Sequence, residues 1–176
     1  MVKEKSQIWV ETAICTLIGL TIIAILLSIA YPQIEKAKDR NVVDQMFNVL
    51  TEIDKKVSEI EQSPASIAYM DIKIGEGSLL IDSAGDTLIY TLENTNLELS
   101  EVGVDVPEGK IILRTEEHGA NFKISLKLDY TSEIDMTYGG DIAGERILQA
   151  GTAPYKLKIE NLASNTGTTK IDLDVS

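Results

Sequence analysis

The chain has 176 residues, a formal net charge of -12 and a single cysteine, and each of these features excludes a class of protein. An acidic chain without a basic patch cannot neutralise phosphates, so nucleic acid is not expected as a partner. The lone cysteine, Cys15, excludes an intramolecular disulfide. Setting aside about 30 residues for an apolar N-terminal helix leaves enough chain for one globular domain.

Residues 7–31 form an apolar segment that we predict to be a membrane-capable helix. No side chain between residues 12 and 30 is charged. A helix over that range rises about 1.5 Å per residue and reaches roughly 28 Å, close to the hydrocarbon thickness of a bilayer. Cys15 lies inside this segment and is expected to pack as a small apolar side chain.

The residues KEKS followed by QIWVE resemble the class III signal peptide of archaeal type IV pilins and archaellins: a short basic leader, a small residue, then Gln first and Glu fifth in the mature chain. The resemblance covers about the first 30 residues. It implies a leader at residues 1–6, a processing site between Ser6 and Gln7, and an assembly role for Glu11. Trp9 stands where many archaeal pilins have Ser, and Cys15 where their short pattern has Leu. The implied partners are a prepilin peptidase, an assembly machinery and copies of the chain itself.

Glu11 is the only acidic residue in the apolar segment. An ionised carboxylate in hydrocarbon costs about 2.5 to 3.5 kcal/mol at a helix centre on insertion scales, and less near an end. Cleavage before Gln7 would create an α-amino group four residues away on the same helical face, able to pair with Glu11 of its own chain or of a neighbour. Alternatively, Glu11 lies at the headgroup level of an ordinary anchor, with Trp9 as an interfacial aromatic.

The cations around the segment do not determine its orientation. Lys3 and Lys5 precede it, whereas Lys36, Lys38 and Arg40 follow it, so the positive-inside rule does not favour a cytoplasmic N-terminus. The pilin resemblance implies a cytoplasmic N-terminus and an external domain, which is the orientation we expect.

Residues 32–62 continue the helical pattern with a different character. Apolar side chains recur every seven residues in two series, which together form one stripe: Val43, Leu50 and Val57, and Met46, Ile53 and Ile60. This spacing predicts an amphipathic helix, bent at Pro32, which lacks a backbone donor. Residues 7–62 would span roughly 84 Å if unbroken. The stripe can pack on the following domain or on neighbouring copies, and we expect its own domain.

Residues 63–176 are predicted to form an antiparallel β-sandwich-like domain, which makes the fold class α+β. After Ser63 and Pro64 the apolar period falls to two. Turn signals separate the strands, among them Pro107-Glu108-Gly109, Gly139-Gly140 and Asn165-Thr166-Gly167. Residues 131–146 are interpreted as a surface loop. The expected strands lie at residues 67–74, 78–82, 87–92, 110–115, 121–130, 155–161 and 169–175.

No arrangement of residues indicates catalysis, so we predict no enzyme, no catalytic residue, no cofactor and no metal site. His118 is the only histidine, and its Glu-Glu-His-Gly context predicts an exposed hairpin tip. The loop from Asp82 to Asp86 contains Ala84 and Gly85 and falls short of a calcium-binding pattern. No phosphate-binding glycine-rich loop and no Asn-linked glycosylation motif occur.

Two functional interpretations follow, with a third that nothing recommends. In the first, the chain is a structural subunit of an archaeal type IV pilus-like filament, held in the cell membrane and then assembled outside the cell through its N-terminal helix. In the second, it is a single-pass membrane-anchored surface protein whose β-rich domain binds a ligand without polymerising. The third is an enzyme. Small residues on several faces of the helix favour helix–helix packing: Thr12, Ala13, Thr16, Gly19, Thr21, Ala24 and Ser28.

Overall fold

The computed structural model describes residues 2–162 and 168–176, with side chains described from Trp9 onward in those ranges. One long helix, α1 (Val2–Glu61), precedes all of the strands. The chain divides into two compact units, Met1–Lys38 and Asp39–Ser176, so α1 contributes to both. The strands are β1 (Ile67–Ile72), β2 (Ser78–Asp82), β3 (Thr87–Thr95), β4 (Asp105–Glu108), β5 (Ile111–His118), β6 (Asn121–Asp129), β7 (Ile134–Tyr138), β8 (Glu145–Gln149), β9 (Tyr155–Asn161) and β10 (Thr169–Val175).

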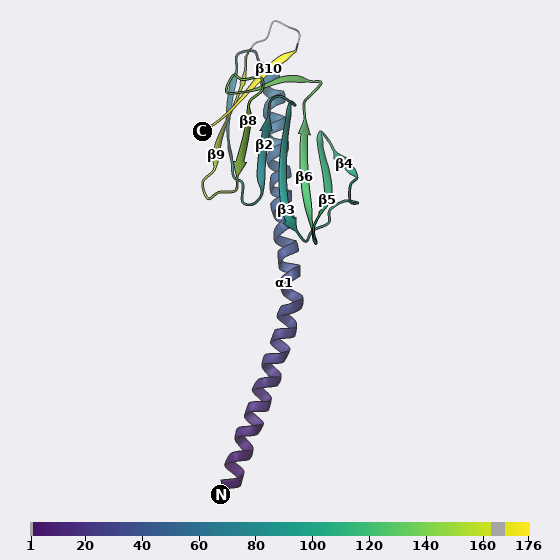
Figure 1. Ribbon diagram of the computed structural model, residues 1–176. Coiled ribbons are helices and arrows are strands. Elements are labelled where there is room, and N and C mark those ends of the chain that lie inside the picture. Colours follow the sequence, from purple (N-terminus) through teal and green to yellow (C-terminus); the bar gives the residue numbers. More distant parts are fainter. Residues whose placement is uncertain (1, 163–167) are drawn as a thin grey trace. The chain divides into compact units, whose positions relative to one another are not determined.

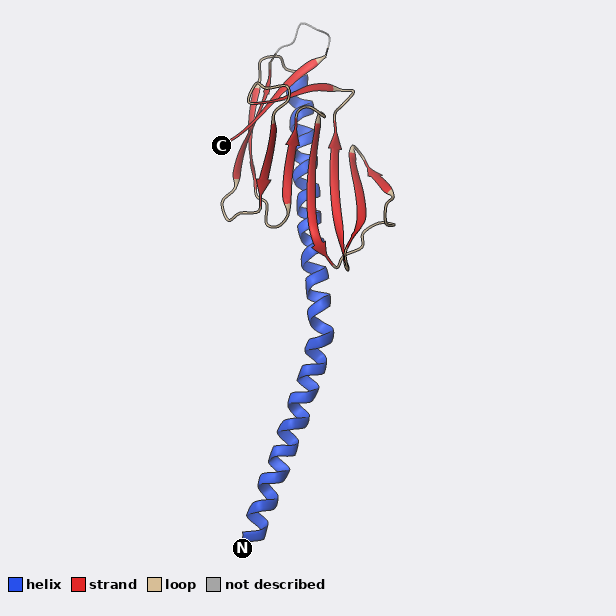
Figure 2. Ribbon diagram, in the orientation of Figure 1, coloured by secondary structure: helices blue, strands red, loops and turns tan. Residues whose placement is uncertain are grey.

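The second unit contains two sheets, as Figures 1 and 2 show. The four-stranded sheet has the order β1-β9-β10-β7, and the six-stranded sheet has the order β4-β5-β6-β3-β2-β8. All pairs are antiparallel except β7 with β10, which is parallel. The predicted α+β class and sandwich-like arrangement are therefore confirmed, with one parallel pair added.

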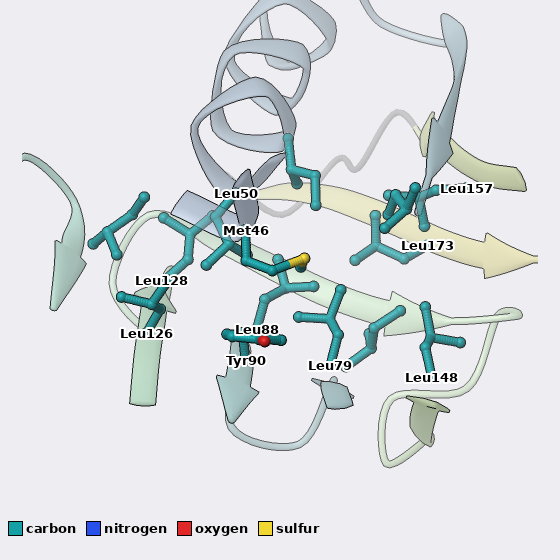
Figure 3. Close-up of a cluster of buried hydrophobic side chains, with 14 of the residues drawn as sticks. Met46, Leu50, Leu79, Leu88, Tyr90, Leu126, Leu128, Leu148, Leu157 and Leu173 are labelled. Atoms are coloured by element: carbon teal, nitrogen blue, oxygen red, sulfur yellow. The ribbon is translucent and has the colours of Figure 1, made fainter. Parts of the chain in front are cut away.

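The core of the second unit lies between the sheets and the helical stripe. All six stripe side chains, from Val43 to Ile60, are buried. Figure 3 shows Met46 and Leu50 of α1 beside Tyr90 and other side chains of the six-stranded sheet. The stripe thus packs on its own domain, as predicted, because its heptad spacing keeps the apolar side chains on one face of the helix.

Hydrogen bonds connect both ends of the part of α1 that lies in the second unit, residues 39–61, to the β-strands. At its start, Asp39 Oδ2 accepts a hydrogen bond from Thr95 Oγ1. At its end, Asn161 Nδ2 donates to the carbonyl oxygen of Ile60 at 3.0 Å, and Asn161 is itself buried. The last carbonyls of a helix have no partner within the helix, and that of Ile60 accepts from Asn161 and also from the Ser63 N–H, at 2.9 Å. The helix ends at Glu61, just before Ser63 and Pro64, as the sequence predicts.

A mixed ionic and aromatic cluster joins the middle of this segment to the six-stranded sheet. Tyr130 is 1% exposed, and its hydroxyl donates to Asp54 Oδ1 at 3.1 Å. Burial, followed by the charge of Asp54, raises the pKa of Tyr130, so the hydroxyl remains a donor. Lys110 Nζ lies 3.4 Å from Asp54, 2.5 Å from Glu133, and 5.6 Å from the centre of the Tyr130 ring.

Three strands were not predicted from the sequence. The segment interpreted as a loop, residues 131–146, contains β7 and the start of β8, so that interpretation was wrong. Its alternation is hidden because two adjacent residues of β7, Met136 and Thr137, are both buried. In β4, Pro107 and Glu108 belong to a strand and not to the predicted turn, which falls at Gly109 instead. The turn predicted at residues 165–167 lies outside the described residues.

Candidate functional site: the exposed apolar segment of α1

The apolar segment of α1 is exposed on every side. Within the first unit, the large apolar side chains from Trp9 to Ile34 are between 45% and 80% exposed. An apolar helix in a globular protein is normally covered on at least one face, whereas here no face is covered by the described chain. The segment is long and apolar enough to cross a membrane, and we treat this surface as the candidate functional site.

The hydroxyl groups of this segment bond to the helix itself. Thr16 Oγ1 lies 2.9 Å from the carbonyl oxygen of Ala13, Thr21 Oγ1 lies 2.8 Å from that of Leu17, and Ser28 Oγ lies 2.8 Å from that of Ile25. A hydroxyl that donates to its own helix one turn back needs no water. Each donor is therefore satisfied even where the surroundings are hydrocarbon or another apolar helix.

These hydrogen bonds within α1 change the interpretation of the small residues. In the sequence they indicated only surfaces for helix–helix packing. The structure gives Thr16, Thr21 and Ser28 internal acceptors. These hydrogen bonds could have been predicted from the sequence, because Ser and Thr inside a helix commonly donate to the carbonyl three or four residues earlier. Gly19 has open space around its Cα.

The structure places Glu11 at the N-terminal end of the apolar segment, in α1, with its side chain exposed. Among the described residues it has neither an ion-pair nor a hydrogen-bond partner. Trp9, 80% exposed, precedes it by two residues in the same helix. Ser6 and Gln7 lie in α1, but their side chains are outside the described residues, so the predicted processing site has no described side-chain geometry.

The other residues singled out in the sequence lie in turns of the second unit. His118 ends β5, pairs with Asn121 across the β5–β6 hairpin and is exposed, as predicted. In the Asp82–Asp86 loop, Asp82 Oδ1 accepts from the Gly85 N–H at 3.1 Å. Within residues 9–162 and 168–176 no three His, Cys, Asp or Glu side chains converge in a way that could hold a metal ion.

The burial of Asp86 raises the pKa of its carboxyl group, although the Met136 N–H that it accepts at 2.8 Å opposes that shift. At Asp129, hydrogen bonds from Lys127 and Thr131 lower the pKa to about 2. Burial accounts for the raised pKa of Asp86, and hydrogen bonds account for the lowered pKa of Asp129.

The fold and this surface together define a class: a β-domain preceded by one membrane-capable helix. Searches of protein-family models, curated proteins and solved structures found no match to this chain.

Proposed function

We propose that the chain is a structural subunit of an archaeal type IV pilus-like surface filament. It is cleaved between Ser6 and Gln7, held in the cell membrane and then assembled outside the cell through its N-terminal helix. The observation that supports this most is the apolar segment of α1, exposed on every face. Such a surface has two stable environments, lipid and copies of the same helix, and a filament subunit occupies them in turn.

The self-bonded hydroxyls support the transfer between these two environments. The donors of Thr16, Thr21 and Ser28 keep their acceptors within α1. Leaving lipid for a helical bundle therefore exchanges one apolar surrounding for another and breaks none of these hydrogen bonds. Repeated head-to-tail contacts of this kind build an open helical array and not a closed oligomer.

Glu11 supplies the proposed registration between subunits. Cleavage before Gln7 frees an α-amino group one helical turn away, and a cation at that point pairs with the exposed Glu11 carboxylate of its own chain or of a neighbour. In an apolar surrounding an unpaired carboxylate is strongly disfavoured, so packing that brings the two charges together is selected over packing that does not.

A second candidate is a single-pass surface protein whose β-rich domain binds a ligand without polymerising. Three observations favour it. An apolar helix is satisfied by lipid alone, and the exposed Trp9 is placed as an interfacial aromatic would be. The cations Lys36, Lys38 and Arg40, all exposed, follow the segment and could contact anionic headgroups.

Mass spectrometry of the N-terminus and electron microscopy of the native protein test the proposal together. We expect a mature chain that begins at Gln7, and fibres in the surface fraction. An intact Met1–Ser6 leader on dispersed surface particles would favour the anchored protein and refute the filament subunit.

Variants at Glu11 test its assembly role separately. We expect Glu11→Ala and Glu11→Gln to be cleaved normally but to lose fibres, because both remove the charge. Glu35→Gln removes a carboxylate beyond the apolar segment and is the matched control that should keep them. Fibres of normal number from Glu11→Gln would exclude the proposed charge pairing.

A further inference from the structure

The two sheets end in four edge strands, and three of these have features that discourage pairing with another chain. The edges are β1 and β7 in the four-stranded sheet and β4 and β8 in the six-stranded sheet. An edge strand exposes a row of unpaired N–H and C=O groups, which can add a strand from another molecule unless charge, proline or capping prevents it.

The edge of β7 is capped. Its alternate N–H groups, at Ile134, Met136 and Tyr138, all have acceptors within the chain. Ile134 and Tyr138 donate to backbone carbonyls of adjacent turns, at 3.2 and 2.9 Å. Met136 donates to Asp86 Oδ1 at 2.8 Å. An incoming strand would find these donors already in use.

The two edges of the six-stranded sheet are obstructed by other means. Strand β4 contains Pro107, which has no N–H to offer. Strand β8 begins with the exposed charges of Glu145 and Arg146, and the carbonyl of Gln149 already accepts the Tyr155 hydroxyl at 2.9 Å. Proline and charge are the usual devices that keep an edge strand from pairing.

Strand β1 contains no proline and no capped outward group, and its single charge, Asp71, lies opposite Lys156 of its own sheet. The Asn161 N–H donates to the Ser66 carbonyl at 3.0 Å, which fixes the alternation of the β1–β9 ladder. Residues 68, 70 and 72 therefore bond to β9, and the N–H and C=O groups of Ile67, Tyr69 and Asp71 point away from it. Within residues 2–162 and 168–176 no backbone hydrogen bond outside the β1–β9 ladder uses those groups. The side chains of Ile67 and Tyr69 are 49% and 59% exposed.

We propose that the open edge of β1 pairs with β1 of a second copy of this chain, antiparallel and centred on Tyr69. In that register Tyr69 lies opposite Tyr69 of the second copy, and Ile67 lies opposite Asp71. All three outward-facing residues of each strand then face one another, which forms about six backbone hydrogen bonds. The contact is isologous, since the same strand serves both molecules.

The proposed register avoids charge repulsion between the two copies of β1. The chain carries a net charge of -12, so most of its surface repels a copy of itself. Strand β1 has one charge, Asp71, which lies opposite Lys156 in its own sheet. The proposed register places each Asp71 opposite an isoleucine and not opposite the other Asp71. The pairing does not require filament assembly, so either proposal can fail without the other.

Disulfide trapping tests the register in the full-length chain in detergent. Cys15 is the only cysteine, so Cys15→Ser gives a background without thiols. Adding Tyr69→Cys places two thiols in a directly opposed pair, and we expect disulfide-linked dimer on mild oxidation in about tenfold excess over a non-paired control. That control is Ile147→Cys, a residue of the β8 edge that is 55% exposed.

A second position makes the trap specific. In the proposed register residue 67 lies opposite residue 71 of the second copy. The two thiols in a dimer of the Ile67→Cys variant are therefore four residues apart along the strand direction, about 13 Å, and should not link. Combining Ile67→Cys with Asp71→Cys should restore linked dimer. Linkage of Tyr69→Cys no greater than that of Ile147→Cys, or equal linkage of Ile67→Cys alone, would overturn the proposal.

Native mass spectrometry gives a readout that needs no thiol. Tyr69→Pro removes an outward N–H and leaves the bonds of β1 to β9 in place, and Tyr69→Lys adds a charge at the edge. We expect both variants to shift the detergent-solubilised chain from dimer to monomer, while Ile147→Lys does not. If Tyr69→Lys melts like the parent and remains dimeric, or if the parent is monomeric at every concentration tested, the edge of β1 does not pair with a second copy.

Discussion

Replacing the same residue type at two positions of α1 separates the two roles of the helix. Leu50 is fully buried in the second unit, whereas Leu20 in the first unit is 65% exposed. Leu→Ala removes three side-chain carbons, worth about 2.4 kcal/mol of transfer free energy at about 0.8 kcal/mol each. The cavity left at Leu50 raises the expected loss to about 3 to 4 kcal/mol, within the range measured for buried leucines.

For a domain of this size, that loss lowers the melting temperature by about 10 °C. The sole tryptophan, Trp9, lies outside the domain core, so fluorescence is a poor probe. Near-ultraviolet circular dichroism of the buried Tyr90 and Tyr130 in a mild detergent reports the transition directly. We expect Leu50→Ala to melt early and Leu20→Ala to melt like the parent. A loss below about 1 kcal/mol for Leu50→Ala, or equal losses for both variants, would refute the assignment of the stripe to the domain core.

Three further variants test contacts of the second unit by thermal melting. Tyr130→Phe removes the bond to Asp54, and we expect a loss of about 1 kcal/mol, since Asp54 keeps its lysine partner; an unchanged melting temperature would contradict this. Asn161→Ala removes one of the donors to the Ile60 carbonyl, and we expect a loss of about 1 to 2 kcal/mol; no loss would mean that the Ser63 N–H, which donates to the same oxygen at 2.9 Å, is sufficient. Asp86→Asn keeps an acceptor for the N–H of β7 but removes the negative charge. Burial raises the pKa of the Asp86 carboxyl group, which means that its ionised form is disfavoured in the folded state. The Asn variant should therefore be more stable than the parent at neutral pH, and the advantage should disappear below the unfolded-state pKa near 3.8; an advantage that persisted at low pH would refute the electrostatic cause.

The sequence predicted those parts of the fold in which one residue pattern decides the structure. The heptad stripe of α1 and the alternating strand β6 are each recognisable because one face is buried and the other is more exposed to solvent. Strand β10 also shows apolar alternation in sequence, although its Asp172 is buried together with Ile171 and Leu173. Strand β4 was missed because it is short and contains Pro107, and β8 because Leu148 is its single buried residue. Strand β7 pairs in parallel with a distant strand, and such pairing leaves no local turn signal.

The two surfaces on which the proposals rest also differ in how well the sequence predicts them. The apolar segment of α1 was predictable because it follows from composition, whereas the proposed leader and the proposed role of Glu11 rest on a residue-by-residue resemblance. The open edge of β1 was not predictable, because it depends on which strand pairs with β9 and on what caps the other three edges. Asp86, for example, closes the edge of β7 from a turn 50 residues earlier in the chain.

The helical segment that begins at Asp39 also sets how the second unit would bear mechanical load. A force along the helix axis first acts on the hydrogen bond from Thr95 to Asp39. To move the helix, it must then slide all six buried stripe residues past the sheets at once. Loading in shear shares the force among all of these contacts, whereas peeling would break them one at a time. At the far end, the bond from Asn161 to Ile60 ties the last turn of the helix to β9. The stripe that forms the core is therefore also the part of the domain that resists extension.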